Sequence, residues 1–219
     1  AGGAGVNATC RTTPADGNAA RNPGDVYQNS KPEGERVALA EFSRGLPGVV
    51  FRPVGIYGPG DTRFLKLFRT IQTGRFRMFG SGEVLYHLTY IDDLIDGVIL
   101  CGEVPAALGE VFLLAGPRYT TLNELVSLVA EALGRPAPRG RLPLWPLLTA
   151  ATLCEAVCRP FGIDPPLHQR RCDFFVKDRA FTSAKARKAL GYEPKIDLAT
   201  GLRRTAEWYR ETGLLGKRM

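Results

Sequence analysis

The chain has 219 residues, of which 44% are hydrophobic and 23% are charged. This composition excludes an intrinsically disordered chain and supports one large hydrophobic core or two small ones. No run of about 18 unbroken apolar residues occurs, so no membrane-spanning helix is predicted. The five cysteines have scattered spacings and no export signal precedes them, which favours reduced thiols in a cytoplasmic protein without a bound metal.

Positive charge is concentrated in the second part of the sequence. From Arg135 onward there are 17 Lys and Arg residues against 8 Asp and Glu, whereas the formal charge of the whole chain is only +7. Such a basic region suits a phosphate group or an anionic membrane surface, but a solvated helical surface is the simpler explanation. Aromatic residues do not interleave with the basic ones, so we expect no nucleic-acid partner. A membrane-surface contact stays an alternative, and a homodimer is compatible with the sequence.

Apolar spacing, together with capping and turn residues, predicts the elements. In chain order they are a loop at 1–24, a helix from Asp25 to about Gly45, a strand at 49–51, a Gly/Pro loop at 55–60 and a helix at 62–73. Then come short strands near 76–79 and 85–90, a helix from a capping Asp92 to about 100, a strand at 111–115, and helices at 121–133, 183–190 and from Asp197. Residues 1–75 therefore look like half of an α/β sheet unit, followed by a mainly helical domain at 76–219.

Tyr27 and Lys31 lie four residues apart in the first predicted helix, which places them on one side of it, one turn apart. A free phenol has a pKa near 10 and is a poor acid or base at neutral pH. A nearby ammonium group favours the phenolate and lowers that pKa, so Tyr27 becomes a candidate proton donor and acceptor. Pro32 and Gly34 follow inside the same helix, and an interior proline predicts a kink there.

Other motifs follow this pair in a specific order: Phe51-Arg52-Pro53, Ile56-Tyr57-Gly58-Pro59-Gly60, Tyr90-Ile91-Asp92-Asp93 and Leu190-Gly191-Tyr192. Together they resemble the extended short-chain dehydrogenase/reductase family, which holds NAD-dependent epimerases and dehydratases and 3β-hydroxysteroid dehydrogenase-like enzymes. The resemblance covers essentially the whole chain. It implies the C-terminal half of a Rossmann-type parallel sheet unit plus a smaller, mainly helical substrate domain, from which one strand returns to the sheet.

The resemblance also implies roles for individual residues. Tyr27 would exchange a proton with the substrate oxygen, and Lys31 would hold the nicotinamide ribose and lower the pKa of Tyr27. The backbone of Pro53, Val54, Gly55 and Ile56 would border the nicotinamide ring of NAD or NADP. A proline with fixed φ and a glycine that permits close approach suit such a loop.

The family's glycine-rich phosphate turn is not recognisable at the start of this sequence. Gly2-Gly3-Ala4-Gly5 imitates it, but no strand precedes these residues and no helix pattern follows them. By the family's spacing to Tyr27, residues 1–8 match the loop that carries a catalytic Ser or Thr, and that position falls at about Gly3. We therefore expect the chain to be an N-terminally truncated piece that lacks the dinucleotide-binding half.

The substrate side is predicted from the residues before Tyr90. In the nucleotide-sugar enzymes of this family an arginine holds a diphosphate about four residues earlier, where this chain has Tyr86, beside His87. A tyrosine does not replace that charge, so a secondary alcohol or ketone on a sterol-like or other apolar scaffold is favoured. The apolar stretch from Leu142 to Val157 suits such a substrate or a membrane surface, and a buried helix explains it equally well. A nucleotide-sugar epimerase or dehydratase and an inactive fragment are the alternatives.

Overall fold

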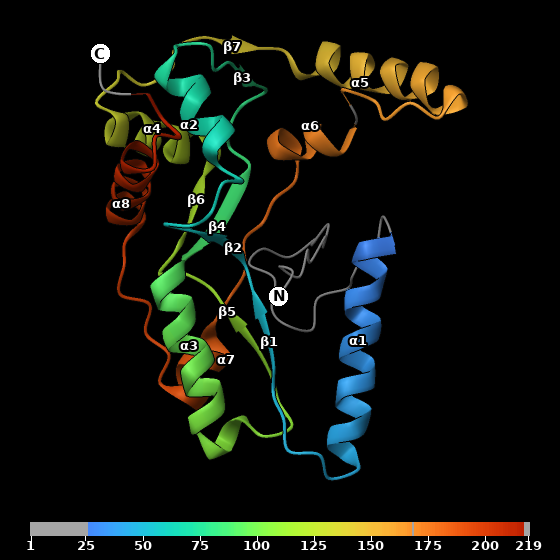
Figure 1. Ribbon diagram of the computed structural model, residues 1–219, viewed down its shortest axis with the longest axis vertical. Coiled ribbons are helices and arrows are strands. Elements are labelled where there is room, and N and C mark those ends of the chain that lie inside the picture. Colours follow the sequence, from blue (N-terminus) through green and yellow to red (C-terminus); the bar gives the residue numbers. More distant parts are fainter. Residues whose placement is uncertain (1–25, 168, 217–219) are drawn as a thin grey trace.

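The computed structural model describes residues 26–167 and 169–216, so the prediction for Gly2 to Gly5 lies outside the described residues. Its longer helices surround small ladders of strands (Figure 1). The helices are α1 (Val26–Ser43), α2 (Leu65–Gln72), α3 (Ile91–Glu103), α4 (Leu122–Leu133), α5 (Leu144–Cys158), α6 (Gln169–Val176), α7 (Ala184–Leu190) and α8 (Leu198–Glu211), with 3-10 turns at Pro105–Ala107 and Arg159–Phe161. The strands are β1 (Val50–Pro53), β2 (Gly55–Tyr57), β3 (Met78–Phe79), β4 (Leu85–Tyr90), β5 (Val111–Leu114), β6 (Tyr119–Thr121) and β7 (Arg141–Leu142).

The central strands are mainly parallel, which confirms the predicted α/β class. β1 pairs with β5 in parallel, and β2 pairs with β4 in parallel. β6 lies antiparallel on the other edge of β4, and β3 pairs with β7. β5 comes after α2 and α3 in the chain and pairs with β1, so residues 50–53 and 111–114 lie side by side.

The two larger hydrophobic clusters among the described residues hold most of these elements together. The larger one packs α2, α4 and α8 against β4, and its fully buried members include Phe68, Leu125 and Tyr209. The smaller one packs α3 and α7 against β5 around Phe112 and Tyr192. Burial of each such side chain contributes roughly 1.5–3 kcal/mol, so these clusters fix the frame to which the candidate site is attached.

Several helix ends form where the sequence predicted them. Thr121 is the N-cap of α4 and its side chain accepts a hydrogen bond from the Glu124 amide, while Gly134 closes the helix at φ 67°. Asp197 caps α8 in the same way through the Thr200 amide. The predicted Asp92 cap is wrong, because α3 begins at Ile91 after an extended Tyr90 and no side chain caps it.

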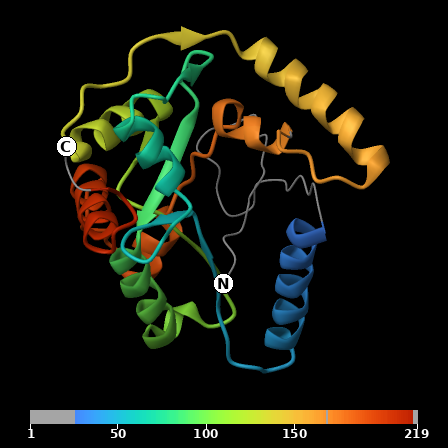
Figure 2. The ribbon, with the colours of Figure 1, turned by 45° about the horizontal axis from the view of Figure 1, so that its top comes forward.

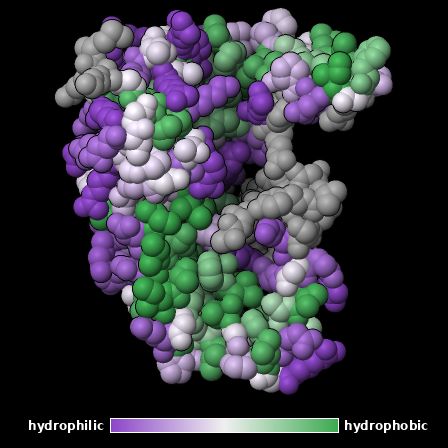
Figure 3. All heavy atoms as spheres, in the orientation of Figure 1, coloured by the Kyte–Doolittle hydropathy of each residue, from purple (hydrophilic) through white to green (hydrophobic). Residues whose placement is uncertain are grey.

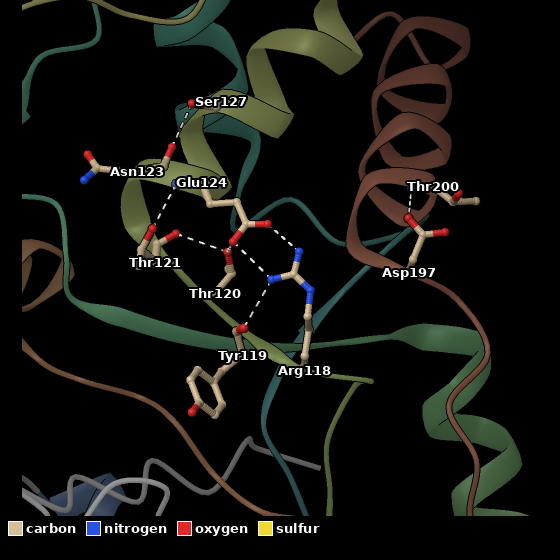
Figure 4. Close-up of polar contacts among 9 residues, drawn as sticks. All are labelled: Arg118, Tyr119, Thr120, Thr121, Asn123, Glu124, Ser127, Asp197 and Thr200. Carbon is tan, nitrogen blue, oxygen red and sulfur yellow. Dashed lines mark hydrogen bonds and ion pairs between the residues drawn. The ribbon is translucent and has the colours of Figure 1, made fainter.

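A polar network surrounds the start of α4 (Figure 4). The Glu124 carboxylate accepts hydrogen bonds from the Arg118 guanidinium and from the Thr120 hydroxyl. These bonds lower the pKa of Glu124 to about 2, so the carboxylate stays charged at any physiological pH. The network therefore ties the loop after β5 to the first turn of α4.

We expect Thr121→Ala to lower the free energy of unfolding by about 1 kcal/mol, because one amide in the first turn of α4 loses its acceptor. Urea denaturation followed by circular dichroism measures the change. Thr149→Ala is the matched control, since the Thr149 hydroxyl only bonds back to the Trp145 carbonyl on exposed α5. Equal losses in the two variants would contradict the capping role.

The apolar stretch from Leu142 to Val157 forms α5, and the helix is largely exposed. Within it only Ala151 is buried, whereas Trp145, Leu153 and Val157 are more than 60% exposed. Figure 3 shows this hydrophobic surface at the upper right, over α5. Of the explanations that the sequence left open, a buried helix is therefore wrong for this chain, because contacts with α6 and with the turn at Arg159–Phe161 leave most side chains of α5 unburied.

Candidate active site

A partly buried ion pair connects α1 to β1. The Arg52 guanidinium donates from Nε to Glu35 Oε2 at 2.9 Å and from Nη2 to Glu35 Oε1. The two side chains are only 10% and 14% exposed. A two-pronged pair of this kind fixes both distance and orientation. It therefore holds the middle of α1 against the carboxyl end of β1, one residue before Pro53.

This contact sets the orientation of the Tyr-x-x-x-Lys helix. Residues 27, 31 and 35 follow one another at intervals of one turn on one side of a helix, so the side of α1 that meets β1 also carries Lys31. α1 runs opposite to β1, so its first turns lie beyond the carboxyl end of that strand (Figure 1). The Tyr27 side chain lies outside the described part of the structure. Pro32 does not end the helix, which is continuous from Val26 to Ser43.

The segment predicted to border a nicotinamide ring is not a loop, because it comprises the end of β1 and the start of β2, where the chain changes strand partners. β1 pairs with β5 as far as Pro53, and the Val54 amide still donates to Leu114 O at 3.2 Å. From Gly55 the chain pairs instead with β4. A Cβ at Gly55 would lie 2.7 Å from the Leu88 Cδ2 atom, so a larger residue there would require the end of the Leu88 side chain to shift. Ligands of α/β folds bind outside the carboxyl ends of parallel strands where neighbours diverge in this way.

Tyr86 lies on β4 and contacts an arginine that the sequence did not single out. Its hydroxyl donates to Phe174 O at 2.6 Å and accepts from Arg179 Nη1 at 2.9 Å, and the guanidinium lies 5.0 Å from the ring centroid. Burial raises the pKa of Tyr86, so the phenol stays protonated. Arg179 belongs to no recognisable sequence motif. It pairs with Tyr86 through an isolated parallel bridge although the two residues are 93 positions apart in the sequence, so local spacing could not indicate the contact.

His87 is 5% exposed, and both ring nitrogens meet backbone groups. Nε2 lies 3.0 Å from Gly116 O, while Nδ1 lies 3.0 Å from Phe181 O and 3.4 Å from the Phe181 amide. Burial lowers the pKa of His87, which favours a neutral ring that donates from one of its two nitrogens. Direct substrate contact by Tyr86 or His87 stays a prediction.

The lowered pKa of His87 makes stability depend on pH. In the unfolded chain His87 binds a proton near pH 6.5, whereas in the folded chain it binds one only at lower pH. The contribution of His87 to the free energy of unfolding is therefore fully present above about pH 6.5 and decreases as the pH falls below that value. We expect this residue to contribute a loss of up to about 1.4 kcal/mol per pH unit. Urea denaturation of the native chain and of His87→Gln at pH 7.5 and 5.5 measures it. An identical pH dependence in both proteins would refute the assignment, since His168 and the carboxylates are common to both.

In the part of the chain that the structure describes, no group of three or more His, Cys, Asp or Glu side chains is placed to hold a metal ion. None of the described helices combines the length and the apolar character that crossing a membrane requires.

A mainly parallel α/β arrangement with a helix fixed at the carboxyl end of a strand is typical of the Rossmann-type class of folds. Within that class, the chain belongs to the NAD dependent epimerase/dehydratase family, which matches residues 4–115. This confirms the resemblance inferred from the motif order.

Two curated relatives support the family assignment. The chain is 32% identical over 204 residues to the uncharacterized protein y4nL of Sinorhizobium fredii, covering 88% of this chain and 56% of that protein. It is 30% identical over 198 residues to the 3beta-hydroxysteroid-dehydrogenase/decarboxylase isoform 1 of Arabidopsis thaliana, covering 84% of this chain and 45% of that protein. The chain thus spans about half the length of these relatives.

A solved structure shows the same fold. The UDP-glucuronic acid 4-epimerase of Bacillus cereus, in complex with NAD, superposes with a TM-score of 0.71 over 96% of this chain and 60% of that protein. The two sequences are only 19% identical, so this likeness concerns the fold alone.

Proposed function

We propose that the protein containing this chain is an NAD(P)-dependent oxidoreductase that interconverts a secondary alcohol and a ketone. The observation that carries the proposal is the Glu35–Arg52 pair, which directs the Lys31 side of α1 toward the carboxyl end of β1. Membership of the NAD dependent epimerase/dehydratase family supports it. The backbone from Pro53 to Ile56, with no side chain at exposed Gly55, fits the flat face of a nicotinamide ring.

In this proposal the chain's own residues bind and move a proton. Lys31 holds the ribose hydroxyls of the cofactor, and its positive charge favours the phenolate form of Tyr27. The Tyr27 hydroxyl then gives a proton to the ketone oxygen, or takes one from the alcohol. When bound, the nicotinamide supplies or accepts the hydride.

We propose an apolar, sterol-like substrate in preference to a nucleotide sugar. Similarity to the plant 3beta-hydroxysteroid-dehydrogenase/decarboxylase supports this choice, as does the exposed apolar surface of α5, on the same side of the molecule as α1 in two views (Figures 1 and 2). The nucleotide-sugar alternative has one observation in its favour, since Arg179 brings a guanidinium to the Tyr86 side chain. That guanidinium also donates to the carbonyls of Asp173 and Lys177, which leaves it fewer free donors for a diphosphate.

We also propose that the two parts of the chain bind different ligands. We place the cofactor contacts in residues 1–75 and the substrate contacts in residues 76–219, with β5 as the strand that returns from the second part to the first.

The test uses the whole protein that contains this chain. We expect enhanced NADH fluorescence on binding, and reduced-nicotinamide absorbance when a 3β-hydroxysterol and NAD or NADP are supplied. Absorbance or product formation with UDP-glucose instead would select the nucleotide-sugar alternative. Neither fluorescence enhancement nor thermal stabilisation by NAD or NADP would overturn the enzyme proposal.

A further inference from the structure

A groove of about 1290 Å³ lies at the end of the molecule opposite α1. Its walls come from α2 and the turn after it, from the loop between α4 and β7, and from the segment after α8. In Figures 1 and 2 these segments meet beside the C-terminus, whereas α1 lies on the other side of the strands. The groove is therefore separate from the candidate active site.

The charged side chains that line the groove are all positive. They are Lys66, Arg69, Arg75, Arg77, Arg135 and Arg139, and no Asp or Glu is among the lining residues. Guanidinium groups stay charged at any physiological pH, so the charge is permanent. Cations gathered around one cavity repel one another, and a bound polyanion relieves that repulsion.

Among the residues that the structure describes, two of these six side chains donate hydrogen bonds to backbone carbonyls. Arg69 donates from Nε and Nη2 to Leu214 O at 3.1 and 2.9 Å, and Arg77 donates from Nη1 to the carbonyls of Gly74 and Phe76. Within residues 26–167 and 169–216, by contrast, the side chains of the other four make no hydrogen bond or ion pair. These four are Lys66, Arg75, Arg135 and Arg139.

The loop that carries Arg135 and Arg139 is held at both ends. Its first amide, that of Arg135, donates to Ala130 O at 2.9 Å, and after the loop β7 pairs with β3. Pro136 and Pro138 restrict the backbone between these anchors. A loop held in this way loses little conformational entropy when its side chains bind a ligand.

We propose that this basic groove binds a ligand carrying two or more phosphate groups. Arginine forms charge-assisted, two-pronged hydrogen bonds with phosphate oxygens, and the groove offers cations on facing walls. A single small anion needs neither this volume nor this number of cations.

Inorganic tripolyphosphate is the probe, and isothermal titration calorimetry on the full chain at low salt measures its binding. We expect saturable binding that weakens at least tenfold in Arg75→Gln/Arg139→Gln, which removes one unpaired cation from each of two walls. Lys188→Gln/Arg44→Gln removes the same charge from exposed positions outside the groove, and we expect less than a twofold change. Absence of saturable binding, or equal weakening in both double variants, would overturn the proposal.

A second arm distinguishes the two sources of such a ligand. Vesicles that contain phosphatidylinositol bisphosphate are added as competitors of tripolyphosphate. If the vesicles displace tripolyphosphate from the native chain and the groove variant does not bind the vesicles, the ligand is a lipid headgroup. If the vesicles do not displace tightly bound tripolyphosphate, the ligand is a soluble polyphosphate. Because NADH fluorescence reports on the other end of the molecule, it stays unchanged in the groove variant, so failure of this proposal and failure of the proposed enzyme function are distinguishable.

Discussion

Replacing Tyr27 by Phe is expected to lower kcat about 100- to 10,000-fold in the protein that contains this chain, which is the contribution that a positioned acid or base typically makes. The ring stays and only the hydroxyl is lost, so cofactor affinity is expected to change little. Steady-state kinetics at saturating NAD or NADP, with NADH binding followed by fluorescence, separates the two effects.

A matched control for this variant is Tyr119→Phe, which removes the hydroxyl of a tyrosine that is 41% exposed on β6. We expect kcat of that variant to stay within twofold of the native value. Full activity in Tyr27→Phe would remove the basis of the proposed proton transfer. Lys31→Ala is expected to weaken cofactor binding as well as kcat, because the ammonium serves both.

Removing one partner of the Glu35–Arg52 pair is expected to cost about 3–5 kcal/mol of unfolding free energy, since the remaining charge stays partly buried without its counter-charge. We expect this loss in Glu35→Gln and in Arg52→Met alike, measured by urea denaturation. The double variant Glu35→Leu/Arg52→Met removes both charges, so we expect it to recover most of that stability.

Glu33 is the matched control on the same helix, because it pairs with Arg36 while both side chains are more than half exposed. Solvent screens such a pair, so no measurable loss is expected in Glu33→Gln. If Glu35→Gln proved as harmless as Glu33→Gln, the pair would not hold α1 on β1. The double variant also tests function, because a stable protein with a displaced α1 is expected to lose kcat.

The sequence by itself determined the features that depend on near neighbours. The predicted helices at 121–133, 183–190 and from Asp197 form with the Thr121 and Asp197 caps and with Gly134 and Gly191 at their ends, because such caps and stops need contacts only within one helical turn. The motif order was also sufficient for the family, because an ordered set of short motifs is specific where each alone is weak.

Only the tertiary structure decided how distant segments meet. The pairing of β1 with β5, the place of Arg179 on the Tyr86 ring, and the meeting of α2 with the loop after α4 join residues that no local period connects. The exposure of α5 was also decided by the tertiary structure, because an apolar sequence looks the same whether neighbouring elements cover the helix or leave it exposed. Spacing along the chain specifies which side of a helix or strand a residue occupies, but packing between elements determines what that side faces.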